Sequence, residues 1–292
     1  MMTIRSALVA TDFSASSDWA TNRAAGIARE TGLHGTLIHV LPGTLPAEFH
    51  LHAAAQAQRA LAIVAEGLEQ QGLHFAPRLV SGAVSGELAR AAAEFDMVIA
   101  GARGEDLLLD FELGRTSNRL VRQSTRPTLI VKRPADRPYR RVLAAVDFSE
   151  PSRAAALCGA QIAPQADIDL VHAFEVEFES AMHRGGVGQD KIEAYRQRAR
   201  DQAMAAMNEF AGGLGLPPQR IWPWVMHGYP PKVILDRAKQ MGAQLIVMGK
   251  RAAGIVEQAL VGSVALEVLR DAECDVLVVP EEAASPWQAK RT

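Results

Sequence analysis

The chain carries one short motif twice. ATDFSAS at residues 10–16 recurs as AVDFSEP at residues 145–151, each time at the end of a short apolar run. Other residues recur in the same order, His39 with His172 and Gly101 with Gly249. A repeat of this length is a whole domain rather than a solenoid unit. The 292 residues are therefore expected to form two related domains, at 1–133 and 139–283, joined by an exposed linker within KRPADRPYRR at 132–141.

Each copy alternates short apolar runs with helical patterns. Runs such as MVIAG, LIVMG, TLIVK and VLVVP contain almost no polar residues, as expected of parallel strands that helices cover on both faces. The sequence therefore predicts an α/β fold with two doubly wound, Rossmann-like domains in tandem, each with a five-stranded parallel sheet. The predicted strands are 4–10, 35–40, 75–80, 97–101 and 128–131 in the first copy, and 142–146, 168–173, 221–226, 245–249 and 276–279 in the second. Predicted helices include 16–31, 85–95 and 231–241, and 175–190 is predicted to be a loop, with a lid or a partner contact as alternatives.

Composition excludes some partners. Thirty-one basic and 33 acidic residues give a net charge of −2, which provides no general attraction for nucleic acid or for an anionic membrane. No apolar run is long enough to span a bilayer. Cys158 and Cys274 lie far apart in apolar surroundings without metal-ligand spacing, so buried reduced thiols and a cytoplasmic location are expected.

Candidate binding residues fall where such sheets hold their ligands. Ligands bind beyond the carboxyl ends of the strands, at the point where the winding direction reverses. Asp12 and Asp147 follow the first predicted strand of each copy, and Gly101 and Gly249 end the fourth. A strand order of 3-2-1-4-5 would bring each aspartate beside its glycine at one crevice per copy.

The segments after these glycines favour an anion. The first copy reads GARGEDLLLDFELGRT and the second GKRAAGIVEQALVGSV. Glycine permits a positive φ and a close approach of phosphate to the backbone, and helices beginning at Thr116 and Ser263 would direct free N–H groups toward it. Positive charge would come from the basic residues Arg103, Arg115, Lys250 and Arg251. Neither a Walker motif nor G-x-G-x-x-G occurs in the sequence.

Taken together, the TDFS and VDFS turns, IHV, VMG and GSVALEVLRDAECDVLVVP resemble the universal stress protein family over nearly the whole chain. ATP-binding members carry Gly-x2-Gly-x9-Gly-[Ser/Thr] and an aspartate after the first strand. The resemblance implies an adenine-nucleotide-binding regulator of the stress response, with ATP as ligand and Mg²⁺ as a candidate companion ion. The resemblance implies a first site at Asp12, Val40, Gly101, Gly104 and Gly114, and a second at Asp147, Gly249, Gly262 and Ser263. The candidate site residues also include Thr11, Arg103, Arg115 and Thr116 in the first copy and Arg251 and Val264 in the second.

Both copies depart from the family pattern. Arg115 stands where serine or threonine is expected, and Ala252 replaces the second glycine of the other copy. Because a backbone shape is harder to replace than one hydroxyl, the sequence favours the first copy for nucleotide binding.

Structural roles compete with these assignments. Asp12 and Asp147 could simply cap turns. Ser263 could serve as a helix N-cap without any ligand. His39 and His172 could make structural hydrogen bonds. The main alternative function is an interaction scaffold with degenerate sites, whose halves pair through strands 128–131 and 276–279 as an intramolecular pseudo-dimer. A homodimer is a further candidate assembly. ATP hydrolysis ranks last: no catalytic residue is predicted, because Ser14 and Ser149 lack a G-x-S-x-G context.

Overall fold

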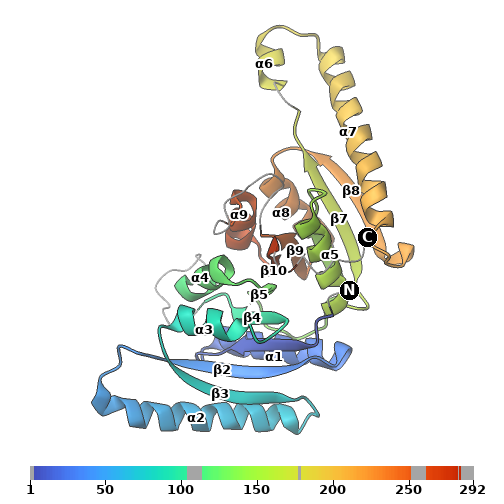
Figure 1. The fold of residues 1–292 in the computed structure, drawn as a ribbon. Coiled ribbons are helices and arrows are strands. Elements are labelled where there is room, and N and C mark those ends of the chain that lie inside the picture. Colours follow the sequence, from blue (N-terminus) through green and yellow to red (C-terminus); the bar gives the residue numbers. More distant parts are fainter. Residues whose placement is uncertain (1–2, 104–113, 177–178, 251–260, 282, 284–292) are drawn as a thin grey trace, which may run out of the picture.

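Ten strands form one continuous sheet in the computed structural model, which describes residues 3–103, 114–176, 179–250, 261–281 and 283. The strand order is β3-β2-β1-β4-β5-β10-β9-β6-β7-β8 (Figure 1). Each half therefore has the order 3-2-1-4-5 of a doubly wound domain, and the predicted α/β class is confirmed.

In the first half, β1 lies between β2 and β4 and is parallel to both. The sheet reverses its winding direction at this point, so a crevice opens between the ends of β1 and β4. The elements are β1 (Ser6–Ala10), α1 (Ala15–Thr31), β2 (His34–Pro42), α2 (Ala47–Glu69), β3 (Phe75–Gly82), α3 (Val84–Ala92), β4 (Met97–Gly101), α4 (Arg115–Gln123) and β5 (Thr128–Val131).

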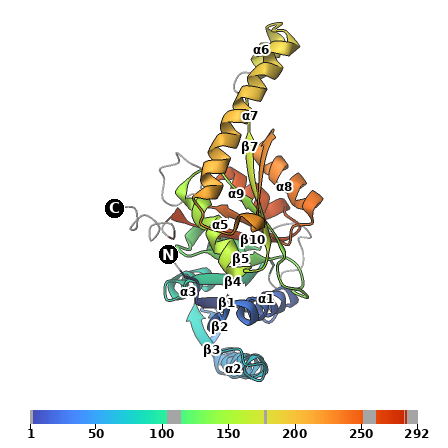
Figure 2. The same cartoon turned by 90° about the vertical axis from the view of Figure 1, so that its right-hand side faces the viewer.

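The second half repeats this plan, with β6 between β7 and β9. Its elements are β6 (Arg141–Ala145), α5 (Glu150–Ile162), β7 (Asp167–Phe174), α6 (Glu179–Arg184), α7 (Gln189–Gly212), a 3-10 turn (Pro218–Arg220), β8 (Ile221–His227), α8 (Pro230–Met241), β9 (Leu245–Gly249), α9 (Ser263–Asp271) and β10 (Asp275–Val279). The predicted loop at 175–190 is wrong in part, because α6 lies within it. Glu179 joins α6 to α7 through an ion pair with Arg196, and both helices extend beyond the sheet (Figures 1 and 2).

Helices cover both faces of the sheet. Buried residues of α1, α2, α5 and α7 pack on one face, and those of α3, α4, α8 and α9 pack on the other. All residues of β4, β5 and β10 are buried, as their uninterrupted apolar runs predict. Alanines fill the sheet-facing side of α1 and α5, for example Ala24 and Ala156, and allow these helices to approach the strands closely.

The two halves join through their last strands. β5 and β10 pair antiparallel, with Leu129 opposite Leu277 and Ile130 opposite Val276. The other pairs of neighbouring strands are parallel. Without the β5–β10 pairing, each half would expose an apolar edge strand. The pairing predicted for an intramolecular pseudo-dimer is therefore present.

A buried charged cluster reinforces this junction. Asp275, 1% exposed, accepts hydrogen bonds from Arg23 Nε at 3.0 Å, Tyr139 Oη at 2.6 Å and the Lys132 backbone N–H at 2.8 Å. The Arg23 guanidinium also lies 4.1 Å from the centre of the Tyr139 ring and donates to the Arg137 carbonyl. The prediction of an exposed linker is thus wrong at Tyr139, whose ring and hydroxyl are needed inside the cluster.

Two lysines cross between the halves. Lys250 Nζ donates to the carbonyls of Arg122 at 2.6 Å and Ser124 at 3.2 Å, at the C-terminal end of α4. Lys132 Nζ donates to the carbonyls of Arg270 and Ala272, at the C-terminal end of α9. Helix ends leave such carbonyls without intrahelical partners, and a cation there also interacts favourably with the helix dipole. Each half therefore caps a helix of the other.

Lys132 makes stability depend on pH in the alkaline range. Burial lowers the pKa of Lys132 from 10.5 to about 8. Between these two values the unfolded chain binds more protons at this position than the folded chain, so the lysine destabilises the fold below about pH 8 and this penalty disappears as pH rises. Relative to Lys132→Met, the wild type is expected to gain up to ~3 kcal/mol of unfolding free energy between about pH 8 and 10.5.

Urea titrations of both proteins at several pH values measure this difference. Burial also raises the pKa of Cys158, and its destabilising effect at high pH is common to both proteins and cancels in the comparison. Cys274 interacts with Lys132, so Cys274→Ala is introduced into both proteins. A difference that stays constant with pH would contradict the shifted pKa.

Candidate functional site

The two Asp-Phe-Ser turns have the same geometry. Asp12 Oδ1 accepts hydrogen bonds from the backbone N–H of Ser14 at 3.1 Å and from its hydroxyl at 2.6 Å, and Asp147 bonds to Ser149 in the same way. The serines in turn cap α1 and α5 by accepting from the N–H groups of Ser17 and Ser152. The turn-capping role of the aspartates agrees with the structure.

The residue between them is strained. Phe13 and Phe148 both have φ 64°, and they are the only residues other than glycine with positive φ in the described part of the chain. An aromatic residue in this conformation costs of order 1–3 kcal/mol. The same conformation recurs in both halves, and in each of them the phenyl ring packs against the core.

The paired histidines hold these turns in place. His39 Nδ1 lies 2.9 Å from the Thr11 carbonyl oxygen, and His172 Nδ1 lies 2.8 Å from that of Val146. Phe13 stacks on His39 with ring centres 4.6 Å apart, and Phe148 lies over His172 at 4.3 Å. The structural interpretation of both histidines is therefore confirmed.

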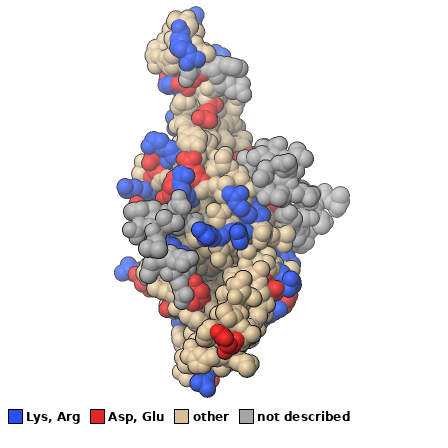
Figure 3. Space-filling view, turned by 90° about the vertical axis from the view of Figure 1, so that its left-hand side faces the viewer, with Lys and Arg blue, Asp and Glu red and all other residues tan. Residues whose placement is uncertain are grey.

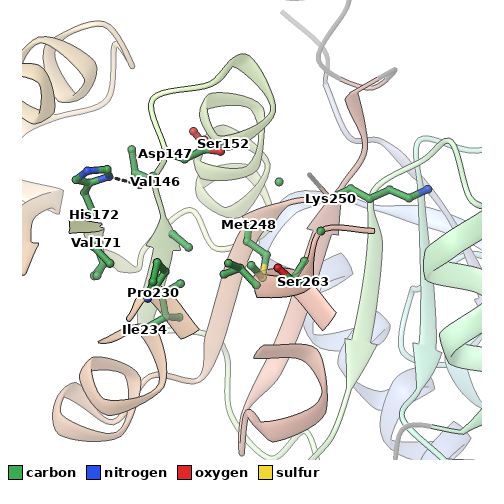
Figure 4. A pocket seen from close by; sticks show the side chains of 16 residues that line it. Val146, Asp147, Ser152, Val171, His172, Pro230, Ile234, Met248, Lys250 and Ser263 are labelled. Atoms are coloured by element: carbon green, nitrogen blue, oxygen red, sulfur yellow. Dashed lines mark hydrogen bonds between the residues drawn. The ribbon is translucent and has the colours of Figure 1, made fainter. Parts of the chain in front are cut away.

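A cavity of about 170 Å³ opens in the second half between the ends of β6 and β9 (Figure 4). Asp147 and Ser152 border it at the first turn of α5, and Ser263 borders it at the first turn of α9. Apolar side chains form most of its wall: Ala145, Val146, Val171, Ala173, Ile234 and Met248. The cavity thus combines a carboxylate, two helix N-termini and an apolar wall.

The comparisons with known proteins agree with this arrangement. The model of the universal stress protein family matches residues 3–132 and 138–280. The chain belongs to the universal stress protein family. A universal stress protein of Mycolicibacterium smegmatis is 28% identical in an alignment 296 positions long that covers 93% of this chain and 96% of that protein. Universal stress protein MJ0531 of Methanocaldococcus jannaschii is 28% identical over 142 residues, which cover 48% of this chain and 82% of that protein.

Solved structures support the fold. The crystal structure of a universal stress protein from Archaeoglobus fulgidus matches with a TM-score of 0.71 and 22% identity, over 94% of this chain and 98% of that one. This likeness extends across both halves, so the tandem arrangement is shared by that protein.

The site glycines of this universal stress protein do not act through positive φ. Gly101, Gly114, Gly249 and Gly262 are absent from the glycines with that conformation, which contradicts part of the reason for predicting them. Gly101 is needed for close packing, since a Cβ there would lie 2.5 Å from Ser16 Oγ and 2.6 Å from the Ser16 carbonyl oxygen. Gly114 and Gly262 are the N-cap residues of α4 and α9, and neither supplies a side chain to cap its helix.

Lys250 does not supply charge to the site. Its backbone borders the cavity, but its side chain leaves it toward α4, as Figure 4 shows. The prediction of a phosphate-binding role for Lys250 is therefore wrong, because two carbonyls of the other half already hold its ammonium group.

The other predicted residues are distributed as follows. Ser263 and Val264 line the cavity with Asp147, Gly249 and Gly262. In the first half, Thr11 Oγ1 lies 3.1 Å from Ser17 Oγ, Val40 is buried in β2, and the Arg103 N–H donates to Ser16 Oγ. Arg115 and Thr116 are exposed at the start of α4. Gly104, Arg251 and Ala252 lie outside the described residues.

Sequence reasoning missed the apolar wall of the cavity. Val171 and Ala173 lie near the end of β7, and Ile234 lies in the first turns of α8. Their positions beside a predicted strand end were the available signal, but apolar residues there are equally typical of ordinary core.

The two crevices differ in charge. In the first half, Asp18 of α1 adds a second carboxylate beside Asp12. Partial burial and the nearby Asp12 carboxylate both raise the pKa of Asp18. Arg153 occupies the corresponding position of α5, but its guanidinium lies 4.7 Å from the centre of the Phe210 ring and beside Glu150, and it does not line the cavity. Ser16, which contacts Gly101 and Arg103, corresponds to Pro151, which has no hydroxyl. The second crevice therefore has no acidic residue at the position of Asp18.

Within the described residues, no cluster of three or more His, Cys, Asp or Glu side chains is arranged to hold a metal ion. No described helix is both long and apolar enough to cross a membrane. Cys158 and Cys274 are buried free thiols, as predicted.

Proposed function

We propose that this universal stress protein binds an adenine nucleotide in the second crevice and acts as a nucleotide-dependent regulator of the stress response. The observation that supports this most is the cavity at the ends of β6 and β9. Asp147 and Ser263 border this cavity, and apolar side chains form most of its wall. Ligand sites in doubly wound sheets occupy this position.

Each part of a nucleotide has a matching surface. The apolar wall around Val171, Ile234 and Met248 suits a purine base. The Asp147 carboxylate suits ribose hydroxyls as a hydrogen-bond acceptor. At about 170 Å³ the cavity is too small for a whole nucleoside triphosphate, so we expect the phosphates at its mouth beside Ser263. The first amides of α9 have no side-chain cap, so they and the helix dipole favour an anion there.

The second half is preferred over the first on charge. A triphosphate near Asp12 would meet the added charge of Asp18, whereas the second half has no acidic residue at the equivalent position. Ser263 also provides the hydroxyl that Arg115 replaces in the first half. The sequence favoured the first half for nucleotide binding, whereas this proposal assigns the nucleotide to the second half.

A regulator is preferred over an enzyme because the serines nearest the aspartates are engaged as helix caps. The proposal also includes Mg²⁺ bound with the phosphates. It further includes a cytoplasmic location and a homodimeric assembly. The alternative is a scaffold in which both crevices are without ligand, held together by the β5–β10 junction.

The duplication supplies a matched pair of variants. Asp147→Ala is expected to weaken ATP binding at least about tenfold, since a buried ribose contact to a charged acceptor is worth roughly 1.5–3 kcal/mol. Asp12→Ala is expected to leave affinity within about twofold. Isothermal titration of both variants with ATP and with adenosine, each with and without Mg²⁺, measures the effect.

Equal losses in both variants would place ligands in both halves, and a larger loss in Asp12→Ala would reverse the assignment. The scaffold alternative predicts no heat of binding with the wild type. Thermal unfolding of each variant without ligand shows whether loss of the turn hydrogen bond, rather than loss of contact, causes the change.

A further inference from the structure

A second cavity lies between α4 and α9, which flank the junction of the two halves. It encloses about 390 Å³ and is lined by Asn118 and Arg122 of α4 and by Ser263, Leu266, Glu267, Leu269 and Arg270 of α9. We call it the α4–α9 groove. Apart from Ser263, it shares no lining residue with the cavity described above.

Its α4 side carries an arginine stripe. Arg115, Arg119 and Arg122 are spaced four and three residues apart, which places them along one face of the helix. Arg115 and Arg119 are exposed, and Arg122 Nε donates to Asn118 Oδ1. In the described part of the chain no carboxylate forms an ion pair with these three arginines. Figure 3 shows Lys and Arg side chains gathered near the middle of this face.

This stripe opposes the stability of its own helix. Arg115 and Arg119 are like charges one turn apart, and Arg115 stands at the first position of α4, where the helix dipole favours an acid. The N-cap Gly114 supplies no side-chain hydrogen bond, and α4 contains no acidic residue. Sequences that violate several local rules at once do so mainly at functional sites.

The α9 side adds an apolar surface. Leu266 and Leu269 line the groove between Arg122 and Arg270. Arg270 is paired with Asp271, and Glu267, the acid among the described lining residues, accepts a hydrogen bond from Tyr229 Oη at 2.8 Å. The groove thus presents aliphatic side chains beside the Arg122 and Arg270 guanidinium groups, with one carboxylate, Glu267, that Tyr229 holds.

We propose that the α4–α9 groove binds a short acidic segment of a partner protein, with one aliphatic side chain against Leu266 and carboxylates on Arg119 and Arg122. Guanidinium groups bind carboxylates in a planar, two-pronged geometry that suits this arrangement. The stripe spans only about 10 Å along α4, at 1.5 Å per residue. A nucleic acid strand carries more charges than this stripe can match, whereas two arginines suffice for a segment with few carboxylates.

Fluorescence anisotropy tests this on the full chain. The probe is a fluorescein-labelled peptide of about twelve residues in which leucine alternates with pairs of glutamates. Arg119→Glu/Arg122→Glu is expected to weaken its binding by about tenfold or more, because reversed charges repel the peptide. The matched control, Arg59→Glu/Arg198→Glu, changes net charge equally on exposed positions of α2 and α7 and is expected to bind like the wild type.

A peptide with glycine in place of leucine is expected to bind severalfold more weakly, which tests the apolar contact. Equal affinity of the wild type and the groove variant would overturn the proposal. It would also be overturned if a twelve-nucleotide single-stranded DNA bound more tightly than the peptide through the same arginines. Circular dichroism confirms folding, and Arg119→Gln/Arg122→Gln, with the same expected direction, serves if charge reversal unfolds α4.

Discussion

Replacing Asp275 with alanine is expected to lower the free energy of unfolding by about 3–5 kcal/mol. The carboxylate is the common acceptor for Arg23 in α1, for Tyr139 in the linker and for the Lys132 N–H after β5. Its removal leaves the Arg23 charge, whose side chain is 7% exposed, without its anionic partner, and leaves two further donors without an acceptor. A lone buried charge costs far more than the intact pair contributes.

The exposed pair of Arg270 and Asp271 provides the control. Asp271→Ala removes a carboxylate only four residues away, at 2.7 Å from Arg270 Nε, but water solvates both partners. Its expected loss is below about 1 kcal/mol. Urea unfolding of the two variants and the wild type gives both values. Similar losses for Asp271→Ala and Asp275→Ala would show that burial of the cluster does not matter.

Because the cluster joins three segments, its loss also affects how the halves unfold. Arg23 belongs to the first half and Asp275 to the second. Asp275→Ala is therefore expected to broaden the transition, as the halves begin to unfold separately, whereas Asp271→Ala keeps the wild-type width.

Gly101→Ala is expected to cost about 3 kcal/mol through overpacking. The new Cβ would lie 2.5–2.7 Å from the hydroxyl oxygen, carbonyl oxygen and carbonyl carbon of Ser16. Two of these atoms belong to the backbone of α1, so a rotamer change cannot relieve the contact and the helix itself must move away from β4. The same movement would disturb the hydrogen bond from the Arg103 N–H to Ser16 Oγ.

Gly26→Ala makes the same chemical change within α1, the helix that Gly101 contacts. Nothing lies within 4 Å of the Cβ position at Gly26, and alanine is the better helix former. This variant is expected to be neutral or to stabilise the fold by up to about 1 kcal/mol. Thermal and urea unfolding compare the two variants, and a neutral Gly101→Ala would contradict the packing role.

Gly101→Ala also separates packing from ligand binding. If the nucleotide binds in the second crevice as proposed, the folded fraction of Gly101→Ala keeps the ATP affinity of the wild type. A large loss of affinity in folded protein would instead place the ligand beside Gly101, in the first half.

The sequence alone determined the architecture. Uninterrupted apolar runs such as MVIAG and VLVVP identified buried parallel strands, and the duplicated Asp-Phe-Ser turns identified two equivalent crevices. These features are local, because strand burial and turn chemistry are encoded within a few residues of each other. The strand ends were predicted closely, for example 97–101 and 245–249.

The tertiary structure decided how each polar group is used. Lys250 and Arg103 looked alike as phosphate ligands, yet Lys250 caps a helix of the other half, and Tyr139 and Asp275, far apart in the sequence, share one buried hydrogen bond. The crevices also differ through Asp18, a residue that no site motif includes. The physical reason is that a side chain's free energy depends on which donors, acceptors and charges surround it, and contacts between distant segments set those surroundings.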